Sequence, residues 1–289
     1  MSDARAMSEE RKQFRAGLAL TMAATAFALF GLVSACGVTI FSLEDETAMG
    51  RKVAAEIEAN PKEYPPYRGD PAVERYVNEV FHNLLPAGAV EYQEEFAYQV
   101  RLIDKGDAKN AFALPGGFIY VYTGLLGYLD SEAALAGVLA HEIGHCERRH
   151  ASKRITSYYG AQVALSLVLG RNPGMMAELA ANLFTGMAFL ANSRSDEREA
   201  DEFSIDVLAD TKYYPGGMTF FFEKMRAKGE TEESSDFSQL FKTHPAPLER
   251  IDEMNERLMA RGITLKSYGA TGEGIFRERY QREVVAKLR

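Results

Sequence analysis

An apolar helix with three ionisable residues in one short pattern near its end sets the strongest limit on the fold of this chain. Residues 132–149 read EAALAGVLAHEIGHCERR, in which His141, Glu142 and His145 form the pattern H-E-x-x-H. Unpaired polar groups are costly inside a protein, so other elements have to bring partners to these side chains. The apolar residues around them recur at the spacing of a buried helix: Leu135, Val138, Leu139 and Ile143.

The spacing of the three ionisable residues is typical of a zinc site. Residues four apart lie about 40° apart around a helix, so both imidazoles project from one face. Two ring nitrogens placed in this way can bind one zinc ion at about 2.0–2.1 Å. Glu142 lies about 100° from His141, beside the metal, where a carboxylate can act as general base on a water. We therefore predict one zinc ion per chain, bound by His141 and His145, with Glu142 as the catalytic residue.

A catalytic zinc ion needs a third protein ligand, and an acidic stretch downstream offers candidates. Residues 193–201 read SRSDEREAD and contain Asp196, Glu197, Glu199 and Asp201. Glu197 and Asp201 are four apart and share a helix face, so one can bind metal while the other supports a ligand histidine. Glu199 points away from that pair. The residues alone do not choose between these carboxylates, and a solvated helix start would show the same charge pattern.

Two other residues close to the H-E-x-x-H pattern are expected to be structural. His150 follows His145 by five residues, which is too far around a continuous helix to share its face. Cys146 lies about 100° from His145 and is expected to be a buried thiol. With Cys36 it makes two cysteines in the chain, which excludes a disulfide-rich scaffold and a zinc site of four cysteines.

The N-terminus has the layout of a targeting segment. A region with four basic residues precedes an uncharged apolar run over residues 17–35, as in a secretory signal peptide. Residues 33–36 read VSAC and resemble a bacterial lipobox, in which cleavage leaves the cysteine as a lipidated N-terminus. We predict a lipoprotein signal peptide over 1–35, lipidation of Cys36 and a tether over 36–45. The alternative is an uncleaved anchor, because about 19 apolar residues can just span a bilayer.

The remaining residues predict a single α+β domain that is mostly helical. Phe96–Leu102 and Phe118–Tyr122 alternate or cluster as strands do, and helical patterns dominate from Asp130 onward. We assign residues 46–260 to this domain and 261–289 to a C-terminal extension packed on it. Acidic residues outnumber basic ones by 41 to 33, a balance that argues against a nucleic-acid partner.

Several motifs in order resemble those of one family. Residues 110–117 read NAFALPGG and are followed by FIYVYTGLL, SEAALAGVLAHEIGHCERRH, SRSDEREAD and THPAPLERI. Together they resemble the zinc metallopeptidases that include the CAAX prenyl endopeptidases, HtpX and the BepA-type periplasmic proteases. The resemblance is strongest to short lipoprotein members from the bacterial envelope. It implies a gluzincin-type domain with a small sheet beside the zinc cleft. It also implies that Glu197 is the third zinc ligand and Asp201 its partner on the same helix.

The same resemblance implies a function. We expect a zinc-dependent endopeptidase of the bacterial cell envelope that hydrolyses misfolded or unassembled envelope proteins. The alternative is a chaperone-like assembly factor that binds such clients with little proteolysis. Partners would be protein or peptide substrates and the membrane, through a periplasmic-side lipid anchor. Gly37 after the cysteine favours the outer membrane, whereas an uncleaved helix would anchor the chain in the inner membrane.

Two further expectations concern the cleft. A peptide substrate often adds a strand to an exposed sheet edge, and Phe112–Tyr122 is the candidate edge, with Gly116 and Gly117 permitting close backbone approach. The alternative is that this run lies within the core sheet. The resemblance places His244, in the sequence THPAP, near the active site. His244 is a candidate fourth ligand that would displace the nucleophilic water and close the resting enzyme. The alternative is that it only packs or caps its loop.

Overall fold

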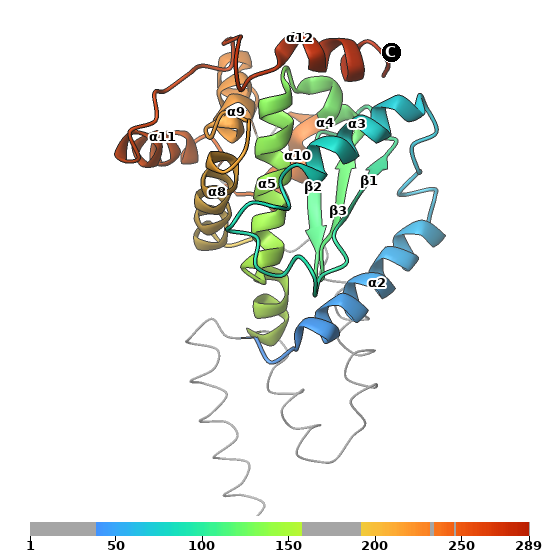
Figure 1. Cartoon of the computed structure of the whole chain (residues 1–289). Coiled ribbons are helices and arrows are strands. Elements are labelled where there is room, and N and C mark those ends of the chain that lie inside the picture. The colour runs from blue at the N-terminus through green and yellow to red at the C-terminus, as the bar shows by residue number, and fades with distance from the viewer. Residues whose placement is uncertain (1–38, 158–191, 232–233, 246, 289) are drawn as a thin grey trace, which may run out of the picture.

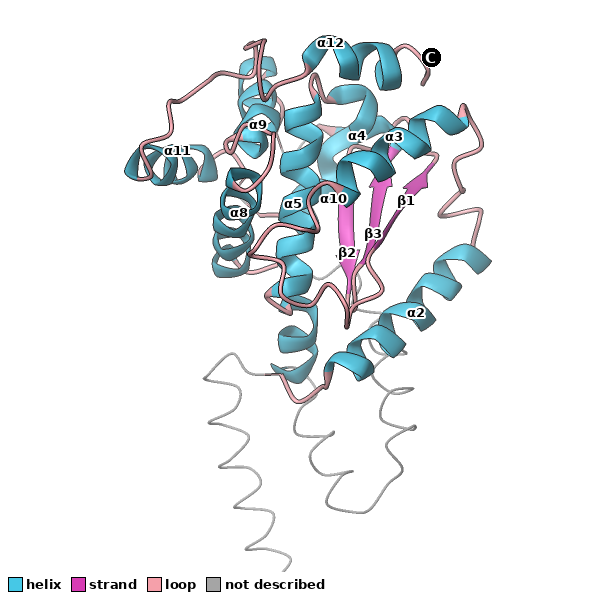
Figure 2. Ribbon diagram, viewed as in Figure 1, coloured by secondary structure: helices cyan, strands magenta, loops and turns pink. Residues whose placement is uncertain are grey.

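The structure of the protein is a computed structural model that describes residues 39–157, 192–231, 234–245 and 247–288. The expected signal peptide and Cys36 lie outside these residues. The described elements are, in chain order, α2 (Leu43–Ala59), α3 (Pro71–His82), β1 (Gln99–Ile103), β2 (Ala111–Leu114), β3 (Phe118–Tyr122), α4 (Thr123–Tyr128), α5 (Glu132–Glu147), α8 (Arg194–Ala209), α9 (Gly217–Lys228), η1 (Ser235–Phe237), α10 (Ser238–Thr243), α11 (Arg250–Ala260), α12 (Arg277–Tyr280) and η2 (Gln281–Val285). The expected α+β, predominantly helical fold is confirmed (Figure 2).

Side-chain caps explain where the functional helices begin. Ser131 accepts a hydrogen bond from the backbone of Ala134 and starts α5. Ser193 and Asp196 form a capping box at the start of α8, which occupies one of the four candidate carboxylates. A similar box at Ser42 starts α2 at Leu43.

The small sheet has three strands in the order β1-β3-β2, so β3 is its central strand. β3 pairs in parallel with β1 and antiparallel with β2. The expectation that Phe112–Tyr122 forms one edge is therefore wrong for β3, and within this run only β2 is an edge strand. Gly116 and Gly117 permit close approach of other parts of this chain. A side chain at Gly116 would collide with Thr47, and one at Gly117 would collide with Tyr98.

Helix α5 lies at the centre of the domain, between the sheet and the pair α8–α9 (Figure 1). Every residue of α5 is buried. Two glycines let its neighbours approach closely, because a Cβ on Gly144 would lie 3.0 Å from Phe203 of α8 and one on Gly137 would overlap the backbone of α9 at Met218. Helix α2 packs on the other face of the sheet, in a smaller core with Tyr120 and Tyr122.

The chain after α11 returns to the buried start of α5. Ile275 and Tyr280 are fully buried in the main core. Arg279 forms an ion pair with the buried carboxylate of Glu132, at 3.0 Å, and Tyr76 donates a hydrogen bond to the same carboxylate. In the described part of the chain, no helix is both long enough and apolar enough to span a bilayer.

Candidate metal centre

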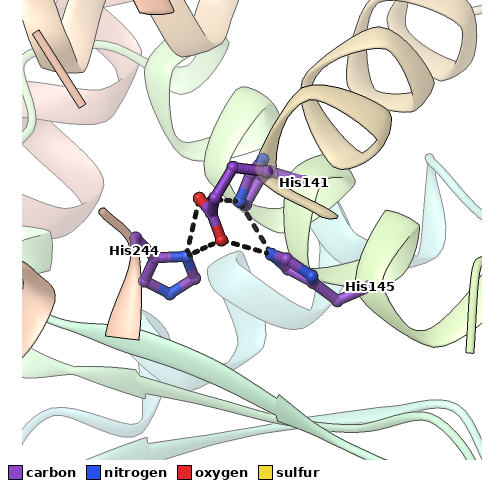
Figure 3. A group of neighbouring side chains, drawn as sticks. His141, His145 and His244 are labelled. Carbon is purple, nitrogen blue, oxygen red and sulfur yellow. Dashed lines mark hydrogen bonds and ion pairs between the residues drawn. The ribbon is translucent and has the colours of Figure 1, made fainter. Parts of the chain in front are cut away.

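The structure brings four potential metal ligands together at the middle of the domain. His141 and His145 come from α5, Glu197 from the first turns of α8, and His244 from the residue after α10 (Figure 3). One donor atom from each lies within 4.8 Å of all the others, and all four side chains are buried. Figure 3 shows the three imidazoles converging on one carboxylate.

The separations between these donor atoms fit a metal ion. Ligands at about 2.0–2.1 Å from a tetrahedral zinc ion are about 3.3–3.4 Å from one another. The Nε2 atoms of His141 and His145 are 3.0 Å apart, and they lie 3.5 and 3.3 Å from the two carboxylate oxygens of Glu197. Two imidazoles and one carboxylate are a donor set that zinc accepts, so the residues present fit this ion.

The charges around the site favour a cation. Burial alone would raise the pKa of Glu197, but His244 and Arg250, with hydrogen bonds from His141 and His145, hold it well below the ordinary value. Burial lowers the pKa of His145 well below its usual range. The carboxyl is thus ionised and this imidazole neutral, which are the forms that bind metal.

His141 is supported from behind by a carboxylate. Its Nδ1 atom lies 3.0 Å from Asp201, one turn after Glu197 on α8. Burial opposes protonation of His141, but Asp201 and Glu197 outweigh it and raise the pKa to about 9. The same negative potential attracts a metal cation, and the contact with Asp201 fixes the orientation of the ring.

Arg250, at the start of α11, holds both acidic residues of α8. It is buried, and its guanidinium donates to Asp201 from Nε at 2.7 Å and also bonds Glu197. It stacks over Phe222 at 4.8 Å. Arg250 lies inside the motif THPAPLERI, but no local pattern in the sequence predicts this role. No spacing rule relates it to α8, because the contact arises only when the two helices pack together.

Glu142 occupies the position expected of a base. It is buried beside His244, whose Nε2 atom lies 3.6 Å from its Oε1 atom, and its Oε2 atom has no hydrogen-bond partner among the described residues. Burial raises the pKa of Glu142. A desolvated carboxylate with a free oxygen is suited to take a proton from a water and to give it up again.

His150 lies beside His145, although helical spacing predicted that the two residues would not share a face. Helix α5 ends at Glu147, and Arg149 adopts a left-handed conformation with φ of 57°. The chain therefore turns back, and Nδ1 of His150 lies 2.8 Å from Nδ1 of His145. Asn192, which also had no role in the sequence analysis, donates to Glu197 at 2.7 Å. Cys146 is turned away, with its sulfur 3.5 Å from the carbonyl oxygen of Leu114.

A groove lies between the edge strand β2 and the metal ligands. Phe112, Leu114 and Pro115 line one wall, and Glu142 and His145 lie at the metal end. Polar side chains complete the lining, from α2, from the turn after α5 and from the helical segment over 150–157: Glu46, Arg149, Ser152 and Arg154.

A comparison with known families matches residues 71–258 to peptidase family M48. The match covers well over half of the 289 residues. The chain belongs to peptidase family M48. Its M48 domain contains every ligand of the candidate metal centre, and the resemblance to a zinc metallopeptidase family is confirmed.

Individual relatives are similar to parts of this M48 protein. The β-barrel assembly-enhancing protease of Yersinia pestis is 28% identical over 233 residues, which are 78% of this chain and 46% of the relative. The metalloprotease LoiP of Escherichia coli is 32% identical over 53% of this chain and 60% of its own. The mitochondrial metalloendopeptidase OMA1 of Schizosaccharomyces pombe is 28% identical over 63% and 52%. The chain spans about half the length of these relatives.

We predict that Arg250→Met lowers the free energy of unfolding of chelator-treated protein by about 3–5 kcal/mol, because it removes the guanidinium that pairs with two buried carboxylates. Urea denaturation measures this change. Arg257→Met on the same helix is the control, since Arg257 pairs with the half-exposed Glu202 and should cost less than about 1 kcal/mol. If both variants lose the same free energy of unfolding, the buried ion pairs of Arg250 stabilise the protein no more than the exposed pair of Arg257 does.

Proposed function

We propose that this M48 protein is a zinc-dependent endopeptidase of the bacterial cell envelope, and that it hydrolyses misfolded or unassembled envelope proteins. One observation carries the proposal: His141, His145 and Glu197 present a zinc donor set beside the free carboxylate oxygen of Glu142, at one end of a groove along a sheet edge. The name of the Yersinia pestis relative refers to assembly of β-barrels, an architecture that spans bacterial outer membranes. That name supports envelope clients.

His141, His145 and Glu197 would hold the zinc ion. When bound, zinc supplies a Lewis acid that polarises the scissile carbonyl. Glu142 accepts the proton of the attacking water at its free oxygen, Oε2, and then passes it to the leaving amine. Asp201 and Arg250 keep the ligands oriented during this cycle.

The edge strand β2 would hold the substrate. Its outer edge pairs with no strand in the described part of the chain, and residues Phe112–Pro115 face the groove. A peptide that adds to this edge gains backbone hydrogen bonds whatever its sequence. Such binding suits an enzyme whose clients share exposed, extended backbone rather than one sequence motif.

The central prediction separates the metal ligand from the base. Glu197→Gln removes a ligand charge and should lower zinc content, while Glu142→Gln should keep zinc and lose turnover of casein by about 10²–10⁴-fold. Metal analysis of the purified variants and a casein digest with and without chelator give both quantities.

Two outcomes would contradict the assignment. Equal zinc loss in both variants would show that the roles of Glu142 and Glu197 are not separate. A wild-type protein that is loaded with zinc, binds denatured client and shows no chelator-sensitive digestion would favour the assembly factor instead.

His244 would act as a switch. Its Nδ1 atom lies 3.1 Å from Glu197, and its ring centre lies 5.4 and 5.5 Å from those of His141 and His145, so it is within reach of the metal position. An imidazole in the fourth position displaces the nucleophilic water. The alternative is a packing role, which the contact of Nε2 with the carbonyl oxygen of Ala111, at 3.3 Å, would also serve.

The switch predicts that His244→Ala raises basal proteolysis, including self-cleavage, while zinc stays bound, because the fourth position opens for water. Casein turnover and zinc content of the same preparation are the measurements. Unchanged or lower turnover in a folded, zinc-loaded variant would leave only the packing role.

A lipid on Cys36 would anchor the protein on the periplasmic side of the outer membrane. Thr39 follows Cys36 by three residue steps, a span of at most about 10 Å. The next residues are fixed on the domain: the amide of Ile40 lies 3.3 Å from Oγ1 of Thr156, and the carbonyl of Phe41 accepts from Arg149 in the groove wall. An anchor at Cys36 would therefore hold the groove close to the membrane surface.

The anchor predicts that Cys36→Ala abolishes lipidation and changes the processing of the N-terminus, so that the protein leaves the outer-membrane fraction. Cys146→Ala is the matched control, since this buried thiol should leave partition unchanged. Fractionation and mass spectrometry of the mature N-terminus are the measurements. An intact Met1 or an unmodified Cys36 in the wild-type protein would overturn the anchor.

A further inference from the structure

Two residues behind the metal centre have no part in the proposed reaction. His150 is buried, and its two ring nitrogens both face ionisable groups. Nδ1 lies 2.8 Å from Nδ1 of His145, and Nε2 lies 3.3 Å from Oε2 of Glu199. Glu199 is on α8, on the side turned away from Glu197, and about half of its side chain is exposed. The three residues form a row from the metal centre to solvent.

A bend in the backbone between His145 and His150 brings these two residues of the row together. His145 and His150 could not meet on one continuous helix, and they meet because Arg149 holds a left-handed conformation, with φ of 57°. This conformation is unfavourable for a residue with a long side chain. The side chain of Arg149 is fixed by the buried Glu46 and by the carbonyl of Phe41. The fold thus holds an unfavourable turn whose result is the contact between the two imidazoles.

The chemistry of imidazole allows one arrangement of protons along the row. A ring nitrogen that binds metal carries no proton, so His145 with Nε2 toward the metal ligands has its proton on Nδ1. That N–H donates to Nδ1 of His150, which must then be the unprotonated nitrogen. The proton of His150 is left on Nε2, where it faces the carboxylate of Glu199.

We propose that His150 is a positioning residue for the metal ligand His145, and that Glu199 fixes the tautomer in which His150 can accept the hydrogen bond. The proposal rests on the proposed zinc site. His141 has a carboxylate, Asp201, directly behind it, whereas His145 has an imidazole between itself and its carboxylate. Both ligand histidines are then held in one tautomer and one ring orientation, from two different directions.

The test is the zinc affinity of the full chain, measured by competition with a chromophoric chelator. His150→Phe keeps a ring but removes the acceptor, and should weaken zinc binding by about 10–100-fold. Glu199→Ala should weaken it by less than His150→Phe in the wild-type background, and should add nothing in the His150→Phe background. Glu202→Ala is the matched control, because Glu202 is a similarly exposed carboxylate of α8 that pairs with Arg257.

A conservative variant distinguishes loss of the hydrogen bond from a folding defect as the cause of weaker zinc binding. His150→Asn offers an amide oxygen near the place of Nδ1 and no donor near Nε2. It should keep most of the zinc affinity and make that affinity insensitive to Glu199→Ala. Nitrogen NMR of the histidine rings gives an independent readout, with the proton of His145 expected on Nδ1 and that of His150 on Nε2.

Three results would overturn the proposal. One is zinc affinity in His150→Phe within about twofold of wild type. Another is that Glu199→Ala weakens zinc binding by the same factor in the wild-type and His150→Phe backgrounds. The third is a wild-type protein that binds no zinc, which would refute the metal centre as well. Loss of affinity in His150→Phe together with an inactive, zinc-loaded wild type would support the row while refuting the proposed proteolysis.

Discussion

The polar side chains of a fully buried helix have to find partners outside that helix, and this requirement organises the domain. Helix α5 is buried along its whole length, yet it contains ionisable residues near both ends and in its middle. Each is met by a different segment. Arg279, near the end of the chain, meets Glu132, while Glu147 accepts hydrogen bonds from the backbone of the loop at Glu91 and Tyr92. The acidic residues of α8 meet the histidines. Because burial of these groups is costly, distant parts of the chain are tied to one helix.

The balance of charge at the centre explains why it suits a cation. Glu197 and Asp201 together bring two negative charges, and Arg250 returns one positive charge. Arg250 bonds one oxygen of Glu197, Oε2, while the other, Oε1, faces His145 and Asn192. The guanidinium therefore fixes the direction of the carboxylate without covering both of its oxygens. A buried ion pair of this kind does not by itself imply stability, but here it aims a ligand.

The sequence predicted those parts of the site that depend on local geometry. His141 and His145 face the same side of α5, as helical spacing predicts. The choice of Glu197 among four carboxylates needed the family resemblance, because spacing alone left it open. His150 was misplaced, since extending the helix through Arg149 ignores a left-handed residue that no local pattern announces. The central position of β3 was also missed, because strand order depends on a long-range parallel pairing with β1.

The metal ligands on α5 and α8 are held differently from His244, the candidate ligand on the groove side. The difference fits the roles proposed for them. The ligands and their supports stand on α5, α8 and α11, which are joined by buried ion pairs and held closely at Gly144. His244 follows α10, a helix of six residues, and is itself followed by Pro245. A change in the conformation of this short segment would alter the groove side while leaving the pairs behind His141 and His145 intact. The positions of the metal ligands therefore do not depend on whether the groove side is open. A single domain can keep its ligands fixed while the residues that face the substrate change conformation.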